Sequence, residues 1–566
     1  MRVNTFFIAM LLLISMGLKA QTKETKEDKA KRMEWFKDAK LGIFIHYGIY
    51  SVNGIDESWS FFNGYINYDD YMKQMNGFTA AKYQPDEWAK LFKESGAKYA
   101  VLTSKHHDGV ALWDTKTDHY NVVDNTPAKR DLVAPFVSAL RDNDMKVGLY
   151  YSLIDWSYPD YPGFLRNKNR YEKDAARWNR FTDFYFTQMR ELSERFNPDL
   201  YWFDGDWEHS ADEWKSADLR NMLVKYNPNV ILNSRLQGYG DYATPEQGLP
   251  VTKPANPYWE LCMTMNDSWG YQHNDHNYKS PFQMIRIFVD CISMGGNLLL
   301  DIGPHADGSI PAPQLAVLKE FGRWTAKHKE AIYGTRAGIS QDHFYGPSAL
   351  SKDKKTLYLY VDHNQESTLK ITGLESAIRS VKVVGYNKKV KHSTEDDITS
   401  IALPHDMLDP TVTVVAVNLK DPIKLKENAT KLFDAKVKPL MKSESWSKKH
   451  EVALNDLTEG IPAGHYNGPT ALSKDKNTLY LFVDGKPNGP LTIKGLKNNI
   501  NRIWVVGNGT KLSHQISGKL YWSAVPGIAY IDVPESVLDK QMTVIAVLLD
   551  GPVDLYREEG QVIESN

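Results

Sequence analysis

The chain is poor in cysteine, in excess charge of either sign and in long apolar runs. Its 566 residues include 2 cysteines, too few for a disulfide framework, and both lie in apolar contexts that favour buried free thiols. Lys and Arg number 68 against 70 for Asp and Glu, so no basic field is present to hold nucleic acid. No Gly-rich fingerprint follows the first predicted strand, which argues against a dinucleotide cofactor.

One long apolar run is present, at the N-terminus. Residues 6–18 are apolar, follow Arg2, and precede a small-residue cleavage pattern at residues 18–20. This length suits a signal peptide better than a membrane span. We expect residues 1–20 to be a signal peptide, the mature protein to be exported to the periplasm or secreted, and no insertion into a membrane.

Residues 30–335 alternate short apolar runs with helical patterns. The runs are LGIFIHYG (41–48), YAVLTSKHHDG (99–109), KVGLYYSLIDW (146–156), DLYWFDGDW (199–207), NVILNSR (229–235) and GGNLLLDIGP (295–304). Strands that alternate with helices favour a parallel sheet, and this many units in one stretch favour a closed barrel. The predicted fold class is therefore α/β, with a (β/α)8-like catalytic barrel over 30–335.

From about residue 340 the pattern changes to short alternating strands, and an internal repeat appears. GPSALSKDKKTLYLYVD (346–362) matches GPTALSKDKNTLYLFVD (468–484) at a separation of 122 residues. The repeat predicts two tandem all-β sandwich domains, over 340–425 and 440–560. No cluster of chemically active residues follows their strands, so we expect the second sandwich to be dispensable for the chemistry.

Polar residues collect where the predicted barrel strands end. They are His46, the group His106, His107 and Asp108, then Asp155 and Trp156, then Asp204, and finally Arg235. Active sites of (β/α)8 barrels lie at the carboxyl ends of the strands. This clustering predicts a catalytic site at that end of the barrel.

Asp204 is the strongest single candidate. It ends an apolar strand and lies between Trp202 and Trp207, so its carboxylate would be partly desolvated and could attack an anomeric carbon. The alternative is a helix-capping Asp. His46, His106, His107 and Asp204 could also bind a metal, but no close-spaced ligand motif supports such a site.

The combination of motifs resembles glycoside hydrolase family 29, the retaining α-L-fucosidases. The matching segments are GIFIHYGIYSV (42–52), SKHHDGVALWDT (104–115), GLYYSLIDW (148–156), DLYWFDGDWE (199–208), YWELCMTMNDSWGY (258–271) and GGNLLLDIGPHADGSIP (295–311). The resemblance implies an exo-acting enzyme that hydrolyses terminal α-L-fucose from oligosaccharides or glycoconjugates by double displacement, without a cofactor. The alternatives are an inactive fucose-binding lectin-like protein and a metal-dependent hydrolase.

The resemblance also implies roles for particular residues. It makes Asp204 the nucleophile, and it assigns substrate binding to His46, Trp59, His106, His107, Tyr150, Arg235 and Trp269. Ser58 stands where the family usually has Glu before Trp59, so Glu57 is only a loose match. The acid/base has two candidates. Glu246, in a predicted loop, is favoured over Glu260, which lies inside an apolar strand and has the context of a structural residue.

Overall fold

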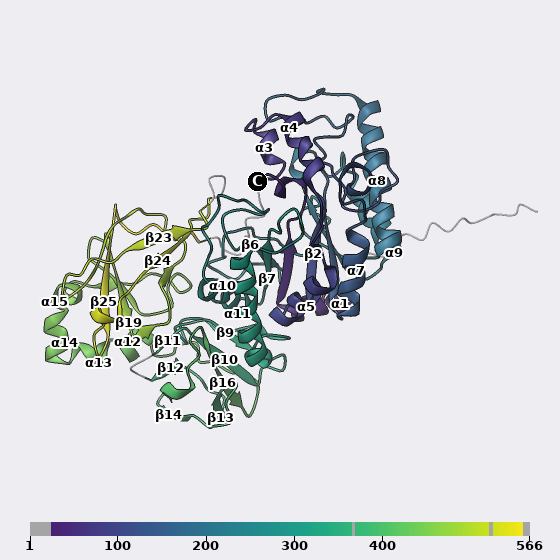
Figure 1. The fold of residues 1–566 in the computed structure, drawn as a ribbon. Coiled ribbons are helices and arrows are strands. Elements are labelled where there is room, and N and C mark those ends of the chain that lie inside the picture. The colour runs from purple at the N-terminus through teal and green to yellow at the C-terminus, as the bar shows by residue number, and fades with distance from the viewer. Residues whose placement is uncertain (1–23, 365–367, 520–523, 558–566) are drawn as a thin grey trace, which may run out of the picture.

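The protein divides into a barrel and two β-rich units that lie on one side of it (Figure 1). The computed structural model describes residues 24–364, 368–519 and 524–557. The predicted signal peptide, residues 1–20, lies outside the described residues. Within the described part of the chain, no helix has both the length and the apolar character needed to cross a membrane.

Seven parallel strands form the wall of the barrel, in the order β5-β4-β3-β2-β1-β7-β6. Their bounds are β1 Leu41–Ile45, β2 Tyr99–Lys105, β3 Lys146–Ser152, β4 Leu200–Asp204, β5 Ile231–Leu232, β6 Glu260–Thr264 and β7 Asn297–Ile302. Almost every residue of these strands is buried, because helices cover the outside and side chains fill the inside.

An irregular segment closes the gap between β5 and β6. Parallel bridges join Asn233 to Tyr242 on the β5 side, and Ala243 to Trp259 and Glu246 to Cys262 on the β6 side. Residues 242–246 thus stand in the place of an eighth strand. The predicted (β/α)8-like barrel followed by all-β sheets is confirmed, although this eighth wall element is too short and irregular to be a regular strand.

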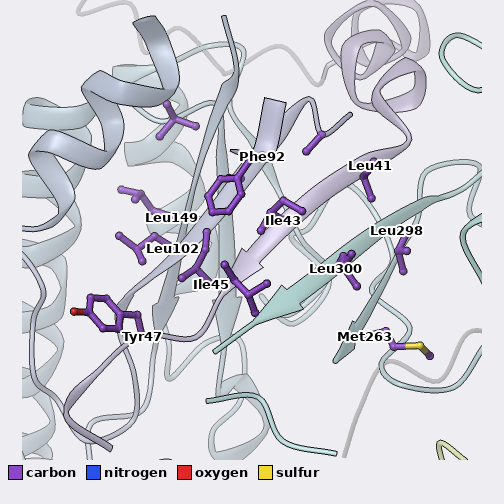
Figure 2. Packing of buried hydrophobic residues seen from close by; sticks show 14 of the residues in the cluster. Leu41, Ile43, Ile45, Tyr47, Phe92, Leu102, Leu149, Met263, Leu298 and Leu300 are labelled. Carbon is purple, nitrogen blue, oxygen red and sulfur yellow. The ribbon is translucent and has the colours of Figure 1, made fainter. Parts of the chain in front are cut away.

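Two hydrophobic layers hold the barrel together. Outward-facing residues of the strands, such as Ile43 and Leu300, pack under the helices together with Phe92 of α5 (Figure 2). The main covering helices are α5 Pro85–Ser95, α7 Val133–Asp142, α8 Ala175–Phe196, α9 Ser216–Tyr226, α10 Pro281–Ser293 and α11 Ala312–His328. Shorter helices lie in the loops: α3 Trp59–Phe62, α4 Tyr68–Met72 and α6 Val122–Asn125.

The inner layer fills the barrel and is rich in aromatic residues. Phe44, Tyr150 and Trp202 belong to it, as does the free thiol of Cys262. Two short helices, α1 Lys26–Arg32 and α2 Glu34–Ala39, close the amino end of the barrel, because Phe36 of α2 packs into the same inner cluster. The opposite, carboxyl end is therefore the open one.

The first β-rich unit consists of two antiparallel sheets around their own core. One sheet holds β8 Arg336–Ala337, β9 Ser348–Leu350, β10 Thr356–Val361, β13 Ile378–Val383 and β16 Thr413–Leu419. The other holds β12 Leu369–Thr372, β14 Lys391–Glu395 and β15 Ile398–Ala402. The outer face of the larger sheet packs on α11, where Trp324 Nε1 donates to the carbonyl oxygen of Val412 at 2.8 Å.

The second β-rich unit repeats this arrangement. Its sheets are β17 Thr458–Glu459, β18 Thr470–Leu472, β19 Thr478–Val483, β22 Ile500–Val505 and β25 Thr543–Leu549, and β21 Leu491–Ile493, β23 His514–Ser517 and β24 Ile528–Ile531. A two-stranded pair, β11 His363–Asn364 with β20 Lys486–Pro487, joins the two units.

Four short helices between the units were not predicted. They are α12 Leu432–Lys436, α13 Lys438–Met441, α14 Glu444–Lys449 and α15 Glu451–Leu454. Each is too short to show a clear helical period, and their apolar residues, including Trp446, instead cover the larger sheet of the second unit.

The repeat is also wider than the sequence indicated. Trp446 Nε1 donates to the carbonyl oxygen of Met542 at 2.8 Å, which matches the bond from Trp324 to Val412. Trp324 and Trp446 are 122 residues apart, the separation found within the sandwiches. The repeated unit is therefore a helix plus a sandwich, and the helix of the first copy is α11 of the barrel.

Candidate active site

Asp204 lies at the open end of the barrel, as the last residue of β4. One carboxylate oxygen accepts a hydrogen bond from Nη1 of Arg235 at 2.6 Å, and the other accepts one from the hydroxyl of Tyr150 at 2.9 Å. Nε2 of His107 lies 3.6 Å from the second oxygen. The Asp204 side chain is 11% exposed, so it is largely desolvated and still open to a ligand.

Arg235 connects Asp204 to a second carboxylate, that of Glu246. Nη1 of the guanidinium donates to Asp204, and Nη2 donates to Glu246. Burial alone would lower the pKa of Arg235, but the charges of Glu246 and Asp204 raise it well above its usual value. The guanidinium therefore stays charged and holds two carboxyl groups at one place, with its Cζ atom 4.6 Å from the centroid of the Trp202 ring.

Glu246 belongs to the segment that completes the barrel wall. Its backbone pairs with Cys262 of β6, and its side chain is 11% exposed. Burial raises the pKa of Glu246, although the neighbouring charge of Arg235 acts in the opposite direction. A raised pKa favours the protonated form of the carboxyl group, and a general acid must be protonated in order to donate.

Glu260, the alternative acid/base, lies elsewhere. It is the first residue of β6, at the closed amino end of the barrel, and it is fully buried. Its carboxyl group accepts hydrogen bonds from the Tyr99 hydroxyl and from Nε1 of Trp202, the latter at 3.2 Å. Burial raises its pKa to about 7. Glu260 thus supports the ring on which Arg235 stacks, and the structure does not bring it to Asp204.

Three histidines surround the open end, and each ring is fixed by a hydrogen bond. His46 Nδ1 lies 2.7 Å from Asp301 Oδ1, and His106 Nδ1 lies 2.7 Å from the Ser58 hydroxyl. His107 Nδ1 bonds to the hydroxyl of Ser152 in the same way. Burial lowers the pKa of all three, that of His107 to about 3. They are neutral imidazoles at any physiological pH, which suits hydrogen bonding to sugar hydroxyls.

Tryptophan rings form the sides of this site. The Trp59 ring lies edge-on to His107, with centroids 5.6 Å apart, and stacks beside Trp207. The Trp269 ring lies 5.0 Å from His46. The Trp269 loop is held from behind, because the buried carboxyl group of Glu57 accepts a hydrogen bond from the backbone N–H of Gly270.

The structure therefore brings together most of the residues that the sequence predicted. Around one opening lie Asp204, Glu246, His46, Trp59, His106, His107, Tyr150, Arg235 and Trp269. Two other strand-end acids serve the fold: Asp155 pairs with the buried Lys105 at 3.1 Å, and Asp108 accepts from Tyr71.

Three supporting residues were missed by the sequence analysis. They are Asp301, Ser152 and Ser58, which fix the rings of His46, His107 and His106. Asp301 interrupts the apolar run of β7 one residue before the strand ends, so its position could have revealed it. Ser152 carries no such signal, because a serine in a strand is ordinary. The sequence analysis noted Ser58 only as a departure from the pattern that the resemblance implies, and its bond to His106 was not predicted. Glu57 points instead to the Trp269 loop.

Within the residues that the structure describes, no group of three or more His, Cys, Asp or Glu side chains is arranged to hold a metal ion. The Nδ1 atoms of the three histidines already face Asp301, Ser58 and Ser152.

Comparison with known proteins agrees with this geometry. The family model described as alpha-L-fucosidase matches residues 14–330. An alpha-L-fucosidase of Branchiostoma floridae is 33% identical over 347 residues, which cover 56% of this chain and 75% of the relative. The tissue alpha-L-fucosidase of Homo sapiens is 30% identical over 395 residues, 64% of this chain and 83% of the relative.

Solved structures give the same result. Alpha-L-fucosidase isoenzyme 1 from Paenibacillus thiaminolyticus superimposes with a TM-score of 0.65 and 33% identity, over 69% of this chain and 100% of that one. A GH29 alpha-L-fucosidase from Bacteroides thetaiotaomicron, trapped as a covalent intermediate, gives a TM-score of 0.63 and 27% identity, over 69% and 96% of the two chains. The chain belongs to the alpha-L-fucosidase family of glycoside hydrolases, family 29.

Proposed function

We propose that the protein is a retaining exo-α-L-fucosidase that removes terminal α-L-fucose from oligosaccharides or glycoconjugates. The observation that carries this proposal is the pair of carboxyl groups, Asp204 and Glu246, held on one guanidinium at the open end of the barrel. Two such groups are what a double displacement needs, one as nucleophile and one as acid/base. A lectin-like protein has no need of either.

In the first step Asp204 attacks the anomeric carbon of fucose. The bond from that carbon to the leaving oxygen breaks, and the proton of Glu246 passes to this oxygen. Tyr150 and Arg235 donate to the carboxylate of Asp204 and so fix its direction of attack. Neutral His46, His106 and His107 bind the sugar hydroxyls, and Trp269 and Trp59 pack against its apolar faces.

In the second step Glu246 acts as a base. It takes a proton from water, the water oxygen attacks the anomeric carbon, and the bond to Asp204 breaks. Two inversions leave the configuration unchanged. The relative from Bacteroides thetaiotaomicron that was trapped as a covalent intermediate supports this route.

Product stereochemistry tests the mechanism. With an aryl α-L-fucoside as substrate, proton NMR should show α-L-fucose as the first product, before mutarotation. Asp204→Asn should lower kcat by several orders of magnitude, because it removes the covalent route. A β product, or a variant within about tenfold of the wild type (about 1.4 kcal/mol), would refute the assignment. A chelator should leave activity unchanged, and inactivation by one would favour a metal-dependent hydrolase.

We also propose that the protein is exported. This rests on the apolar run at residues 6–18 and the cleavage pattern at residues 18–20. N-terminal sequencing of the protein purified from its source should give a first residue close to Gln21. A mature chain that still begins at Met1 would contradict export by this route.

A further inference from the structure

The second β-rich unit touches the barrel beside Glu246. A Cβ atom built on Gly248 would lie 3.0 Å from Cγ1 of Val525, and one built on Gly518 would lie 3.3 Å from the carbonyl oxygen of Gln247. Val525 and Gly518 belong to the connection between β23 and β24. The described residues of this hairpin therefore pack on the backbone that immediately follows the proposed acid/base.

A cavity of 390 Å³ lies between the hairpin and the barrel. The barrel contributes Gln247, Thr264, Asn266 and Asn277 to its lining, and β23 contributes Gln515 and Ser517. The volume falls within the range of about 300–1,000 Å³ that is typical of small-molecule sites. Amide and hydroxyl groups dominate these residues, and such groups match the hydroxyls of a sugar.

The cavity lies at the same end of the barrel as the proposed active site. Thr264 ends β6, and its neighbour in the sheet is Asp301, the partner of His46. The cavity thus begins at the level of the predicted fucose-binding residues. Gln247 follows Glu246 directly in the wall of the barrel. Glu246 faces Arg235 inside the mouth of the barrel, and the Gln247 side chain bonds to Thr264 at the rim.

The chemistry places the leaving group next to Glu246. A general acid must reach the oxygen that departs, at about 2.6–3.2 Å. The remainder of the substrate is attached to that oxygen, so it leaves the mouth of the barrel past Glu246. Gln247 and the hairpin form the part of the rim that adjoins this residue.

We propose that this cavity binds the aglycone, the hydroxyl-rich saccharide to which fucose is attached, and that the second β-rich unit supplies one of its walls. The proposal rests on the proposed function and on Glu246 as acid/base. It gives the second unit a role in substrate selection, and it agrees with the prediction from the sequence that this unit is dispensable for the chemistry itself.

Variants of β23 test the proposal in the full-length protein. Ser517→Trp fills the cavity, and Gln515→Ala removes an amide from an exposed strand position. His514→Trp is the matched control, because His514 is exposed on the same strand and does not line the cavity. The substrates are 4-nitrophenyl α-L-fucoside and the best-hydrolysed member of a set containing 2′-fucosyllactose, 3-fucosyllactose and α1,6-fucosylated chitobiose.

We expect Ser517→Trp to lower kcat/KM for the fucosylated oligosaccharide at least tenfold, and Gln515→Ala to lower it threefold or more. Both should stay within twofold of the wild type on the aryl fucoside, and the control should do so on both substrates. The defucosylated saccharide should also inhibit Ser517→Trp more weakly than it inhibits the wild type.

Two results would overturn the proposal. One is an equal loss on both substrates, which would indicate a general effect on folding. The other is unchanged hydrolysis of the oligosaccharide by both variants. A wild-type protein that is inactive on every fucoside would instead overturn the proposed function and this inference with it.

Discussion

At the scale of single residues, the central feature is one guanidinium that serves two carboxyl groups. Arg235 donates to Asp204 and Glu246 and stacks on Trp202, and Glu260 holds Trp202 in turn. The two glutamates proposed from the sequence thus occupy different layers of the barrel. Their expected behaviour on substitution differs accordingly.

Substitution of Glu246 should lower the activity on substrates with poor leaving groups more than the activity on substrates with good ones. Glu246→Ala should retain much more activity on an activated aryl fucoside than on a fucosylated glycan, because a good leaving group departs without a proton. Azide needs no base, so it should restore turnover and yield α-fucosyl azide. Asp204→Gly with azide should yield the β anomer. Azide rescue of Glu260→Ala, with none for Glu246→Ala, would mean that Glu260 is the acid/base.

The pH dependence of kcat/KM should reflect the protonation of Glu246 and not that of the histidines. The acid must be protonated, so kcat/KM of the wild type should fall as pH rises through the raised pKa of Glu246. The histidines, with pKa values lowered by burial, stay neutral over that range. Glu246→Gln should lose the alkaline limb on an activated aryl fucoside. If the limb persists in this variant, another group sets it.

Glu260 should make stability depend on pH. Its pKa is raised to about 7, so the folded state binds a proton that the unfolded state releases above pH ~4.5. Stability should therefore fall as pH rises from about 4.5 to 7. Glu260→Gln should match the wild type near pH 4.5 and be more stable by up to about 3 kcal/mol above pH 7. Thermal unfolding at both pH values tests this, and equal stability of the two proteins at pH 8 would contradict it.

At the scale of elements, the decisive piece is the segment that stands in for an eighth strand. Residues 242–246 carry Glu246 and pair with β5 and β6 through isolated bridges only. The turn that leads into this segment is tight, because a Cβ on Gly240 would lie 2.1 Å from the carbonyl oxygen of Asn233.

Gly240→Ala should therefore displace the Glu246 segment. We expect kcat/KM to fall at least tenfold, together with a lower melting temperature, because the clash is with backbone atoms that have no free space. Gly238→Asn is the control: nothing lies within 4 Å of a Cβ there, and Asn tolerates its positive φ. Full activity of Gly240→Ala would show that the segment does not depend on this turn.

The sequence predicted the regular elements and the strand-end residues well, for a physical reason. Buried parallel strands are continuous apolar runs, and the residue that ends the run is marked by its polarity, as with Asp204. The 242–246 segment has no such run, so its place in the barrel wall depends on the pairing of its neighbours. The contacts of Ser58 and Ser152 with the histidines were equally hidden, because they join residues that are far apart in the sequence.

At the scale of the whole molecule, buried charges join the three parts. Arg286 and Asp290 lie on α10 of the barrel. Arg286 pairs with Asp362 of the first β-rich unit at 2.6 Å, and Asp290 pairs with Lys494 of the second at 3.4 Å. Each of these groups except Asp362 is at least 95% buried. Arg286 also lies 3.6 Å from Asp290, so loss of Lys494 leaves Asp290 with one cationic partner instead of two. The cost should therefore be smaller than the about 3–5 kcal/mol that is typical when a buried charge loses its only partner.

Lys494→Met should therefore loosen the second unit from the barrel. We expect a clear fall in melting temperature and faster proteolysis between the units. Lys486→Met is the control, because Lys486 forms an exposed pair with Glu535 on the same unit and surface pairs contribute little. Equal melting temperatures for both variants and the wild type would show that the buried pair does not fasten the unit.

The helix shared between the barrel and the repeat has a consequence for the protein's history. Since Trp324 of α11 corresponds to Trp446 of α14, the stretch that was duplicated began inside the present catalytic domain and not at its border. In the second copy, short helices of its own cover the larger sheet, so this sheet does not depend on the barrel for its cover. The larger sheet of the first copy depends on the barrel, because the helix that covers it, α11, also covers the barrel.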